Sequence, residues 1–356
     1  MTDTPAIKRL VIKVGSGVIT LKSSDGSLRI DRNTIFELAA QVNQAVRNGL
    51  DVAVVSSGAV ALGMEELEIN ERPQQMAQVQ ALAAAGQGML MQLWREAFDR
   101  HSLRVGQVLL THSDLADRQR FLNVRATLDS LLAFSVIPII NENDTVMTDE
   151  ITVGDNDNLA AQVTKLVGGD LLILLSNVDG LLDSQDQVVS FVGLDDQPEN
   201  LVDRSTSTHG RGGMASKIEA ARTVGQGGIS VVVANGKRPN VVTDILAGRS
   251  VGTRFDHKKQ GLPSRKHWIA YTLKPKGEIH VDAGAANAVQ NEGASLLSIG
   301  IVRVEGKFSA GDLVRIIDPK GQEFGRGLSR HSSDQIPETV GQRGSTTVHR
   351  DDLIVN

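Results

Sequence analysis

The sequence contains no cysteine among its 356 residues. Disulfides, thiolate metal sites and cysteine nucleophiles are therefore excluded. Long apolar runs are absent too, since none approaches the ~18–20 residues that a membrane-spanning helix needs. The first residues, MTDTPAIKRLVIKVG, hold no apolar signal-peptide region. We therefore expect a soluble, cytoplasmic protein with no membrane partner.

A strong excess of charge of one sign is also missing. The chain holds 37 Lys and Arg against 42 Asp and Glu, a net charge of −5, so the total charge favours neither a nucleic-acid nor a membrane partner. With 40% hydrophobic and 22% charged residues, the composition is ordinary for a globular protein. The length allows two domains, or one large domain with an appendage.

The first 250 residues alternate between short β-branched runs and helical stretches. The runs lie at 10–15, 51–57, 105–111, 136–141, 170–176 and 228–235. The helical stretches lie at roughly 31–48, 75–100, 119–133, 156–167 and 214–226. Strands that read as continuous apolar runs are buried on both faces, and helices supply the cover. The pattern predicts an α/β fold with an open, mostly parallel, doubly wound sheet.

The pattern changes after about residue 250. The segment RFDHKKQGLPSRKHW is basic, contains a proline and has no clean period. From Lys276 onward, short strand-like pieces alternate with glycine turns, which predicts a small β-rich domain. We therefore divide the chain into a sheet domain at 1–258, a connecting segment at 259–275 and a β-rich domain at 276–356.

Polar or glycine-rich turns follow the predicted strands, at the sheet edge where ligands bind in doubly wound folds. These turns are KVGSG at 13–17, SSGA at 56–59, NENDTV at 141–146, GDNDN at 154–158 and SNVDG at 176–180. Strand-to-helix turns favour these residue types in any case, so one such turn alone would carry little weight. Five of them at one edge predict a binding site.

Two lysines beside glycine-rich turns are candidates for a phosphate site. Lys13 ends the first predicted strand, and Lys217 follows the glycines of THGRGGMASK. Glycines let the backbone approach phosphates, and amides at a helix start favour anions. The loop does not have the spacing of a Walker A motif. The alternatives are a surface lysine beside a tight turn, and a flexible loop before a helix.

Two lysines that face one another need a carboxylate to hold them in place. The sequence offers Asp144, Asp155 and Asp157. A lysine pair organised by an aspartate suits phosphoryl transfer, in which positioning and charge stabilisation carry most of the rate. We expect Mg²⁺ to bridge the phosphates and to be bound mainly through phosphate oxygens and water, so no protein ligand is assigned to it.

The remaining turns fit a small zwitterion. Ser57 and the amide of Gly58 suit a carboxylate, and Asp144 suits an ammonium. Asn156 can both donate and accept hydrogen bonds. Together they predict a zwitterionic substrate with a further nucleophilic oxygen. The alternative is that NEND and GDNDN are Asx-rich turns with a purely structural role.

Taken together, the motifs resemble the glutamate 5-kinase branch of the amino-acid kinase family. The matching segments are IKVGSGV, VVSSGAV, AAAGQGMLMQLW, DRQRFLNVRATL, PIINENDTV, VGDNDNLAA, GRGGMASKIEAA and SVGTRF. The piece from GEIHVD to VHRDDL resembles a PUA domain. The resemblance covers nearly the whole chain, and the pair NEND and GDNDN is specific to this branch.

The resemblance implies ATP-dependent phosphorylation of the γ-carboxylate of L-glutamate to L-glutamyl 5-phosphate, the first step of proline biosynthesis. ATP would be the co-substrate, with Mg²⁺, and proline a feedback inhibitor. A homodimer or homotetramer is implied as well, and the next enzyme of the pathway, glutamyl phosphate reductase, is a candidate partner.

The resemblance also implies roles for individual residues. Lys13, Lys217 and Asp157 would be catalytic. Glutamate would be bound by Ser57, Gly58, Asn141, Asp144 and Asn156. ATP would be bound by Lys13, Gly15, Ser16, Ser176 and Asn177, and by the loop residues Arg211, Gly212, Gly213, Met214, Ala215, Ser216 and Lys217.

Two positions depart from the family pattern. Ser176-Asn177 stands where members usually have Thr-Asp, and Arg211 stands where the glycine loop usually has a small residue. Asn in place of Asp removes a negative charge and Arg211 adds a positive one, so the nucleotide side of the predicted site becomes more positive if both face it.

Two other functions stay open. Another acid kinase of this fold could act on acetylglutamate, aspartate, carbamate or a nucleoside monophosphate, although Asp144 suits an unmodified ammonium better than an acetylated nitrogen. RNA binding through the PUA-like domain would call for a basic surface. Residues 276–356 hold nine Lys and Arg against eleven Asp and Glu, so we expect no nucleic-acid partner.

Overall fold

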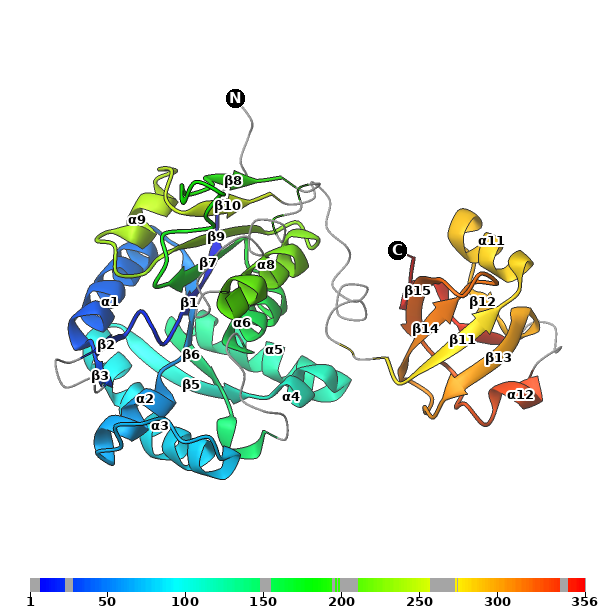
Figure 1. Ribbon diagram of the computed structural model, residues 1–356, viewed down its shortest axis with the longest axis horizontal. Coiled ribbons are helices and arrows are strands. Elements are labelled where there is room, and N and C mark those ends of the chain that lie inside the picture. Colours follow the sequence, from blue (N-terminus) through cyan, green and yellow to red (C-terminus); the bar gives the residue numbers. More distant parts are fainter. Residues whose placement is uncertain are drawn as a thin grey trace. The chain divides into compact units, whose positions relative to one another are not determined.

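The computed structural model describes residues 7–22, 28–147, 155–193, 196, 198, 211–256, 273, 275–339 and 345–355 of the chain. The chain divides into two compact units, residues 1–261 and 262–356 (Figure 1). The connecting segment predicted at 259–275 lies largely outside the described residues, and the predicted domain limits stay a prediction.

An eight-stranded sheet, in the order β5-β6-β4-β1-β7-β9-β10-β8, forms the centre of the first unit. All neighbouring strands are parallel except β9 and β10, which confirms the predicted α/β fold. The strands are β1 (Arg9–Val14), β4 (Asp51–Ser56), β5 (Arg104–Leu110), β6 (Val136–Glu142), β7 (Leu171–Ser176), β8 (Phe191–Val192), β9 (Ser230–Asn235) and β10 (Thr253–Phe255). The hairpin β2 (Thr20–Lys22) and β3 (Leu28–Ile30) lies outside this sheet.

Helices cover both faces of the sheet (Figure 1). One face carries α1 (Arg32–Arg47), α2 (Ala59–Glu66), α3 (Met76–Asp99) and α9 (Val241–Leu246). The other carries α4 (His112–Ala116), α5 (Arg118–Ala133), α6 (Asp155–Leu166) and α8 (Arg211–Gly225). Ile12 of β1 packs into the first core and Val11 into the second. Side chains alternate along a strand, so Lys13 points to the side of α6 and α8.

Two glycines bring α2 and α3 into direct backbone contact. A Cβ on Gly63 would lie 1.9 Å from the carbonyl oxygen of Leu82, and one on Gly86 would lie 1.9 Å from that of Ala59. Only glycine leaves room for so close an approach. The contact fixes α3 against the start of α2, immediately after the turn that carries Ser57.

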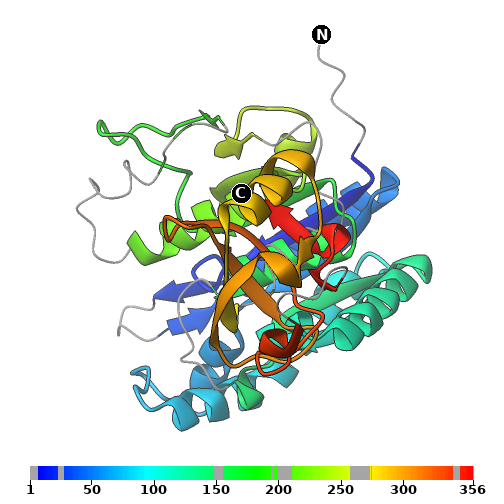
Figure 2. The ribbon, with the colours of Figure 1, turned by 90° about the vertical axis from the view of Figure 1, so that its right-hand side faces the viewer.

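The second unit is β-rich, as predicted. Its five-stranded sheet has the order β13-β11-β14-β15-β17, and β12 pairs with β16. The strands are β11 (Gly277–Val281), β12 (Leu296–Leu297), β13 (Ile301–Gly306), β14 (Leu313–Ile317), β15 (Glu323–Leu328), β16 (Thr346–Val348) and β17 (Leu353–Val355). The short helices η2 (Ser298–Gly300), α12 (Ile336–Thr339) and η3 (Arg350–Asp352) complete the unit, together with α11 (Ala283–Glu292), which lies beside one end of the strands (Figure 2).

Helix α11 was not predicted from the sequence. It begins after Asp282, whose side chain accepts a hydrogen bond from the amide of Ala285 at 2.7 Å, and it ends at Gly293 with φ = +63°. Both caps are typical of helix ends. Within the described residues, no helix is long and apolar enough to cross a membrane.

Lys165 links α6 to α8 at the end of the helices away from the predicted site. Its Nζ donates a hydrogen bond to the carbonyl oxygen of Thr223 at 2.6 Å. Burial lowers the pKa of Lys165 to about 6. The unfolded chain, with a lysine pKa of about 10.4, then holds this proton at pH values where the folded chain has lost it. Stability contributed by this residue should therefore rise with pH between these two values.

We expect the free energy of unfolding of the wild type, minus that of Lys165→Met, to increase by about 1.4 kcal/mol per pH unit between pH 7 and pH 9. Chemical denaturation at each pH measures this difference. Lys8→Met, at an exposed position, controls for the loss of a positive charge. Parallel stability curves for the wild type and Lys165→Met would contradict the prediction.

Candidate active site

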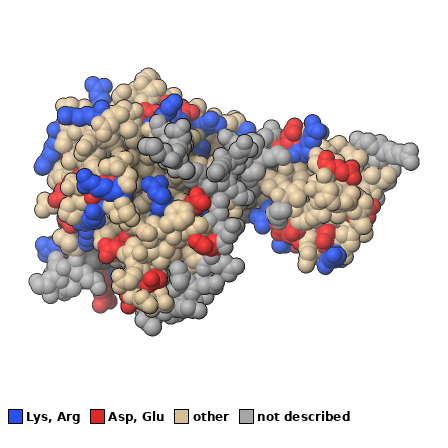
Figure 3. Space-filling view, turned by 90° about the horizontal axis from the view of Figure 1, so that it is seen from above, with Lys and Arg blue, Asp and Glu red and all other residues tan. Residues whose placement is uncertain are grey.

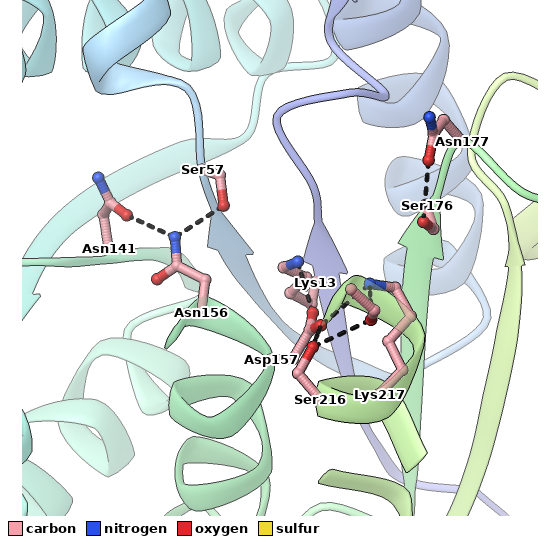
Figure 4. A network of polar contacts seen from close by, with 10 residues as sticks. Lys13, Ser57, Asn141, Asn156, Asp157, Ser176, Asn177, Ser216 and Lys217 are labelled. Carbon is pink, nitrogen blue, oxygen red and sulfur yellow. Dashed lines mark hydrogen bonds and ion pairs between the residues drawn. The ribbon is translucent and has the colours of Figure 1, made fainter. Parts of the chain in front are cut away.

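The carboxyl ends of β1, β4, β6 and β7 bring the predicted turns together. Lys13, Ser57, Asn141 and Ser176 lie at the ends of these strands, with the first turns of α6 and α8 beside them (Figure 4). Parallel strands end at the same edge of a sheet, which is why turns far apart in the sequence meet here.

A buried aspartate between two lysines forms the centre of the site. Asp157 of α6 is 0% exposed, and its Oδ1 lies 2.5 Å from the Nζ of Lys13. Its Oδ2 lies 3.0 Å from the Nζ of Lys217 and accepts a hydrogen bond from the Oγ of Ser216 at 2.8 Å. Of the candidate carboxylates, Asp157 is therefore the one that joins the lysines. The side chain of Asp155 lies outside the described residues, and Asp144 begins the 3₁₀ helix η1 (Asp144–Val146).

The charges of this centre shift the pKa values of Asp157 and Lys13. Burial raises the pKa of the Asp157 carboxyl, but the charges and hydrogen bonds of Lys13 and Lys217 outweigh it and hold that pKa below its usual value. Burial lowers the pKa of Lys13, and the charge of Lys217 acts in the same direction, against the attraction of Asp157. Two cations share one anion, so a bound anion would stabilise the charged form of Lys13.

The start of α8 curls around the Lys217 ammonium. Its Nζ donates a hydrogen bond to the carbonyl oxygen of Gly213 at 2.9 Å. Met214, one residue further along, packs against the core on this face of the sheet, and Ala215 is exposed. Arg211 and Gly212 open the helix, but their side-chain positions and the preceding residues 201–210 lie outside the described part of the chain.

The turn after β1 lies against the end of β7. The amide of Gly15 donates to the carbonyl oxygen of Leu175 at 3.1 Å, and a Cβ on Gly15 would lie 3.6 Å from the Nζ of Lys13. Exposed Ser16 follows it in the same turn. The Oγ of Ser176 donates to the Oδ1 of Asn177 at 3.4 Å, and Asn177 lies beside Gly17. The predicted nucleotide residues Gly15, Ser176 and Asn177 are thus neighbours.

A chain of amide side chains occupies the other half of the site. The Nδ2 of Asn156 donates to the Oγ of Ser57 at 2.7 Å and to the Oδ1 of Asn141 at 3.0 Å (Figure 4). The Nδ2 of Asn141 donates in turn to the Oε1 of Gln87 at 2.8 Å. Gln87, on α3, was not among the predicted site residues. Its signal was present in AAAGQGMLMQLW, where a glutamine follows the closely packed Gly86.

Gly58 fixes the direction of the chain after Ser57. Its φ is +119°, and a Cβ there would lie 2.5 Å from the Cδ1 of Ile19. The amide of Ser57 donates to the carbonyl oxygen of Val14 at 3.0 Å. These contacts hold Ser57 at the edge of the sheet, one strand away from Lys13.

The two halves of the site meet on α6. Asn156 belongs to the amide chain and Asp157 to the lysine centre, and consecutive helical residues point about 100° apart. An arrangement of buried cations on an anchored aspartate, next to polar amides and a hydroxyl, is suited to transferring a phosphoryl group to a small polar acceptor.

Comparison with known proteins agrees with this class of site. The model of the Amino acid kinase family matches residues 8–235, and that of the PUA domain matches residues 277–350. The chain belongs to the amino acid kinase family.

Relatives of similar length indicate which branch of the family the chain resembles most. A protein named Glutamate 5-kinase from Geobacter sulfurreducens is 45% identical, and one of the same name from Shewanella sediminis is 42% identical. Each alignment covers 98% of this chain and 98% of the relative. Among solved structures, Giardia carbamate kinase has a TM-score of 0.51 at 18% identity, covering 71% of this chain and all of that one. N-acetylglutamate synthase from Neisseria gonorrhoeae has a TM-score of 0.53 at 14% identity, over 70% of this chain and 60% of that one. At these identities the structural likeness shows the fold alone.

We expect Asp157→Asn to lower the rate of phosphoryl transfer roughly 10²-fold, the size of effect expected when groups that stabilise transition-state charge are no longer held in position. The neutral amide would leave the two lysines without their shared anion. Steady-state kinetics with saturating substrates measures the change. Glu96→Gln, which removes a carboxylate from the exposed side of α3, is the control. A turnover number for Asp157→Asn equal to that of Glu96→Gln would contradict this role.

Proposed function

We propose that the protein transfers the γ-phosphoryl group of ATP to the γ-carboxylate of L-glutamate and so forms L-glutamyl 5-phosphate, the first step of proline biosynthesis. The observation that carries the proposal is the Lys13–Asp157–Lys217 centre beside the Ser57–Asn156–Asn141 chain at one edge of the sheet. Membership of a kinase family and the name that the near full-length relatives share support it.

The lysine centre would stabilise the phosphoryl group during its transfer. Lys13 and Lys217 would neutralise its developing charge, while Asp157 holds both ammonium groups in place. The attacking γ-carboxylate is already ionised at neutral pH, so the reaction needs no general base. An in-line displacement then depends on positioning and charge.

ATP would lie along the turn after β1 and the end of β7. Gly15, Ser16, Ser176 and Asn177 would line it, and the residues from Arg211 to Lys217 would cover its phosphates. Both oxygens of Asp157 contact lysines, and we assign no protein ligand to the metal ion. Mg²⁺ would be bound mainly through the phosphate oxygens of ATP and water, as is usual for this ion.

Glutamate would lie on the side of the amide chain. The hydroxyl of Ser57 and the amide of Gly58 would bind its α-carboxylate, and Asp144 its ammonium. Asn141 and Asn156 would orient the side chain of Ser57 for this contact. The γ-carboxylate of glutamate would then extend toward Lys13.

RNA binding gains no support from the described surface of the second unit. Basic and acidic side chains are interspersed on the face seen in Figure 3. Lys276 pairs with Asp312 at 2.8 Å, Arg303 pairs with Glu305 at 2.8 Å, and Arg315 contacts Glu278. Arginines engaged in this way are less available to phosphates.

The first experiment is ATP turnover with Mg²⁺ and L-glutamate in the presence of hydroxylamine, which traps an acyl phosphate as its hydroxamate. Parallel reactions contain N-acetylglutamate, aspartate, carbamate or no acceptor. We expect hydroxamate with glutamate and none without an acceptor. Turnover with another acid instead would retain the lysine centre and overturn the assignment of the substrate side.

We further propose that proline inhibits by occupying part of the glutamate site, because both molecules carry an α-carboxylate and a charged α-nitrogen. Asp144→Ala should then raise the glutamate KM and the proline inhibition constant together, each about tenfold or more, as expected for loss of a hydrogen bond to a charged group. Inhibition curves at several glutamate concentrations measure both. A raised KM with unchanged proline inhibition would place proline elsewhere.

A further inference from the structure

The hydrogen-bond chain at the substrate end of the site has a direction. The Oε1 of Gln87 accepts from Asn141, so the carbonyl of Asn141 faces Asn156. The amide of Asn156 therefore turns its Nδ2 toward both Asn141 and Ser57. Each bond sets the orientation of the next side chain, since an amide presents a donor on one side and an acceptor on the other.

The direction decides what Ser57 offers to a ligand. A hydroxyl has a single hydrogen, and the Oγ of Ser57 already accepts from Asn156. The hydroxyl hydrogen is therefore available for donation to a carboxylate. In the opposite direction Ser57 would donate to the Oδ1 of Asn156 and turn only lone pairs toward a ligand, which would repel a carboxylate.

Gln87 is the far end of this chain, and its backbone is held in place. Gly86, the preceding residue, contacts the carbonyl of Ala59 so closely that a Cβ would lie 1.9 Å away. Ala59 follows Gly58 directly, so the helix that carries Gln87 is fixed relative to Ser57. The Nε2 of Gln87 and the Oδ1 of Asn156 are buried and have no hydrogen-bond partner among the described residues, so direct bonds within the chain are what orient these two amides.

We propose that Gln87 is a positioning residue for substrate specificity: by accepting from Asn141 it sets the direction of the chain, and through Asn141 and Asn156 it makes Ser57 a donor to the α-carboxylate of the acceptor. The inference rests on the proposed function. It assigns a role to a residue that needs no contact with the reacting atoms.

Three substitutions of Gln87 distinguish the effect of hydrogen-bond direction from the effect of side-chain charge on glutamate binding. Gln87→Glu, assayed at pH 8, offers only acceptor oxygens and keeps the observed direction. Gln87→Met has a similar length and no acceptor of comparable strength. Gln87→Lys offers only donors and favours the opposite direction. If the chain direction governs binding, the KM for glutamate rises in the order Glu, Met, Lys.

Simple charge predicts the reverse order, because a lysine would attract the anionic substrate and a glutamate would repel it. We expect a KM for glutamate within about threefold of the wild type for Gln87→Glu. For Gln87→Met we expect that KM to rise about tenfold, the effect expected if Ser57 no longer donates a hydrogen bond to the charged α-carboxylate. The KM of Gln87→Lys for glutamate should rise at least as far. The KM for ATP should stay within about twofold in all three.

The matched controls are Gln92→Glu and Gln92→Lys, on the same helix, where the exposed Gln92 donates to Glu96 at 2.9 Å. These should leave the glutamate KM unchanged. Thermal melting of each Gln87 variant, with and without glutamate, separates weakened binding from unfolding. Equal KM values for Gln87→Glu and Gln87→Met, or the order set by charge, would overturn the inference while the proposed function stands. Absence of hydroxamate from wild-type enzyme and glutamate would overturn the proposed function, and the inference with it.

Discussion

The burial of one carboxylate between two ammonium groups is the constraint on which the arrangement of this protein depends. Removing Asp157 from water is costly unless its charge is matched, and Lys13 and Lys217 supply that match from opposite sides. Among the described residues, the two lysines share this one buried carboxylate. Such a centre needs three elements in fixed register, one from β1, one from α6 and one from α8. The parallel sheet provides that register, because its strands end at one edge and the covering helices begin there.

Helix α6 makes the two halves of the site depend on one another. Asn156 and Asp157 are adjacent, so a shift of this helix changes the substrate end and the phosphoryl end together. The helix is held by Leu159 and Val163, which pack into the core beneath the sheet, and by Lys165 at its far end. Positioning groups on a packed helix rather than on a free loop restricts their motion, and phosphoryl transfer depends strongly on such positioning.

Most of the sheet domain could be predicted because its strands are continuous apolar runs and its helices have a clear period. The paired β10 was missed because Thr253–Phe255 is too short to show a pattern. Helix α11 was missed because AGAANAVQNE is short and rich in small residues, so packing and caps decide its conformation. Residue types alone left Asp144, Asp155 and Asp157 open as the anchor of the lysines, and geometry chose Asp157. Gln87 stands in the matching segment AAAGQGMLMQLW, but its contact with Asn141 could not be predicted, because the two residues lie 54 positions apart in the sequence.

The contact between α2 and α3 makes tolerance of sequence change uneven in this region. Gly63 and Gly86 each lie against the backbone of the other helix, so any side chain there would have to push apart two helix backbones that already touch. The first parts to move would be the turn of Ser57 and the segment of Gln87. An inherited change at either glycine would therefore appear in an assay as a failure to recognise the acceptor, although the altered residue lies in the packing beneath the site. If binding-site residues were assigned from kinetic defects alone, residues of the helices that support the site would be wrongly counted among them.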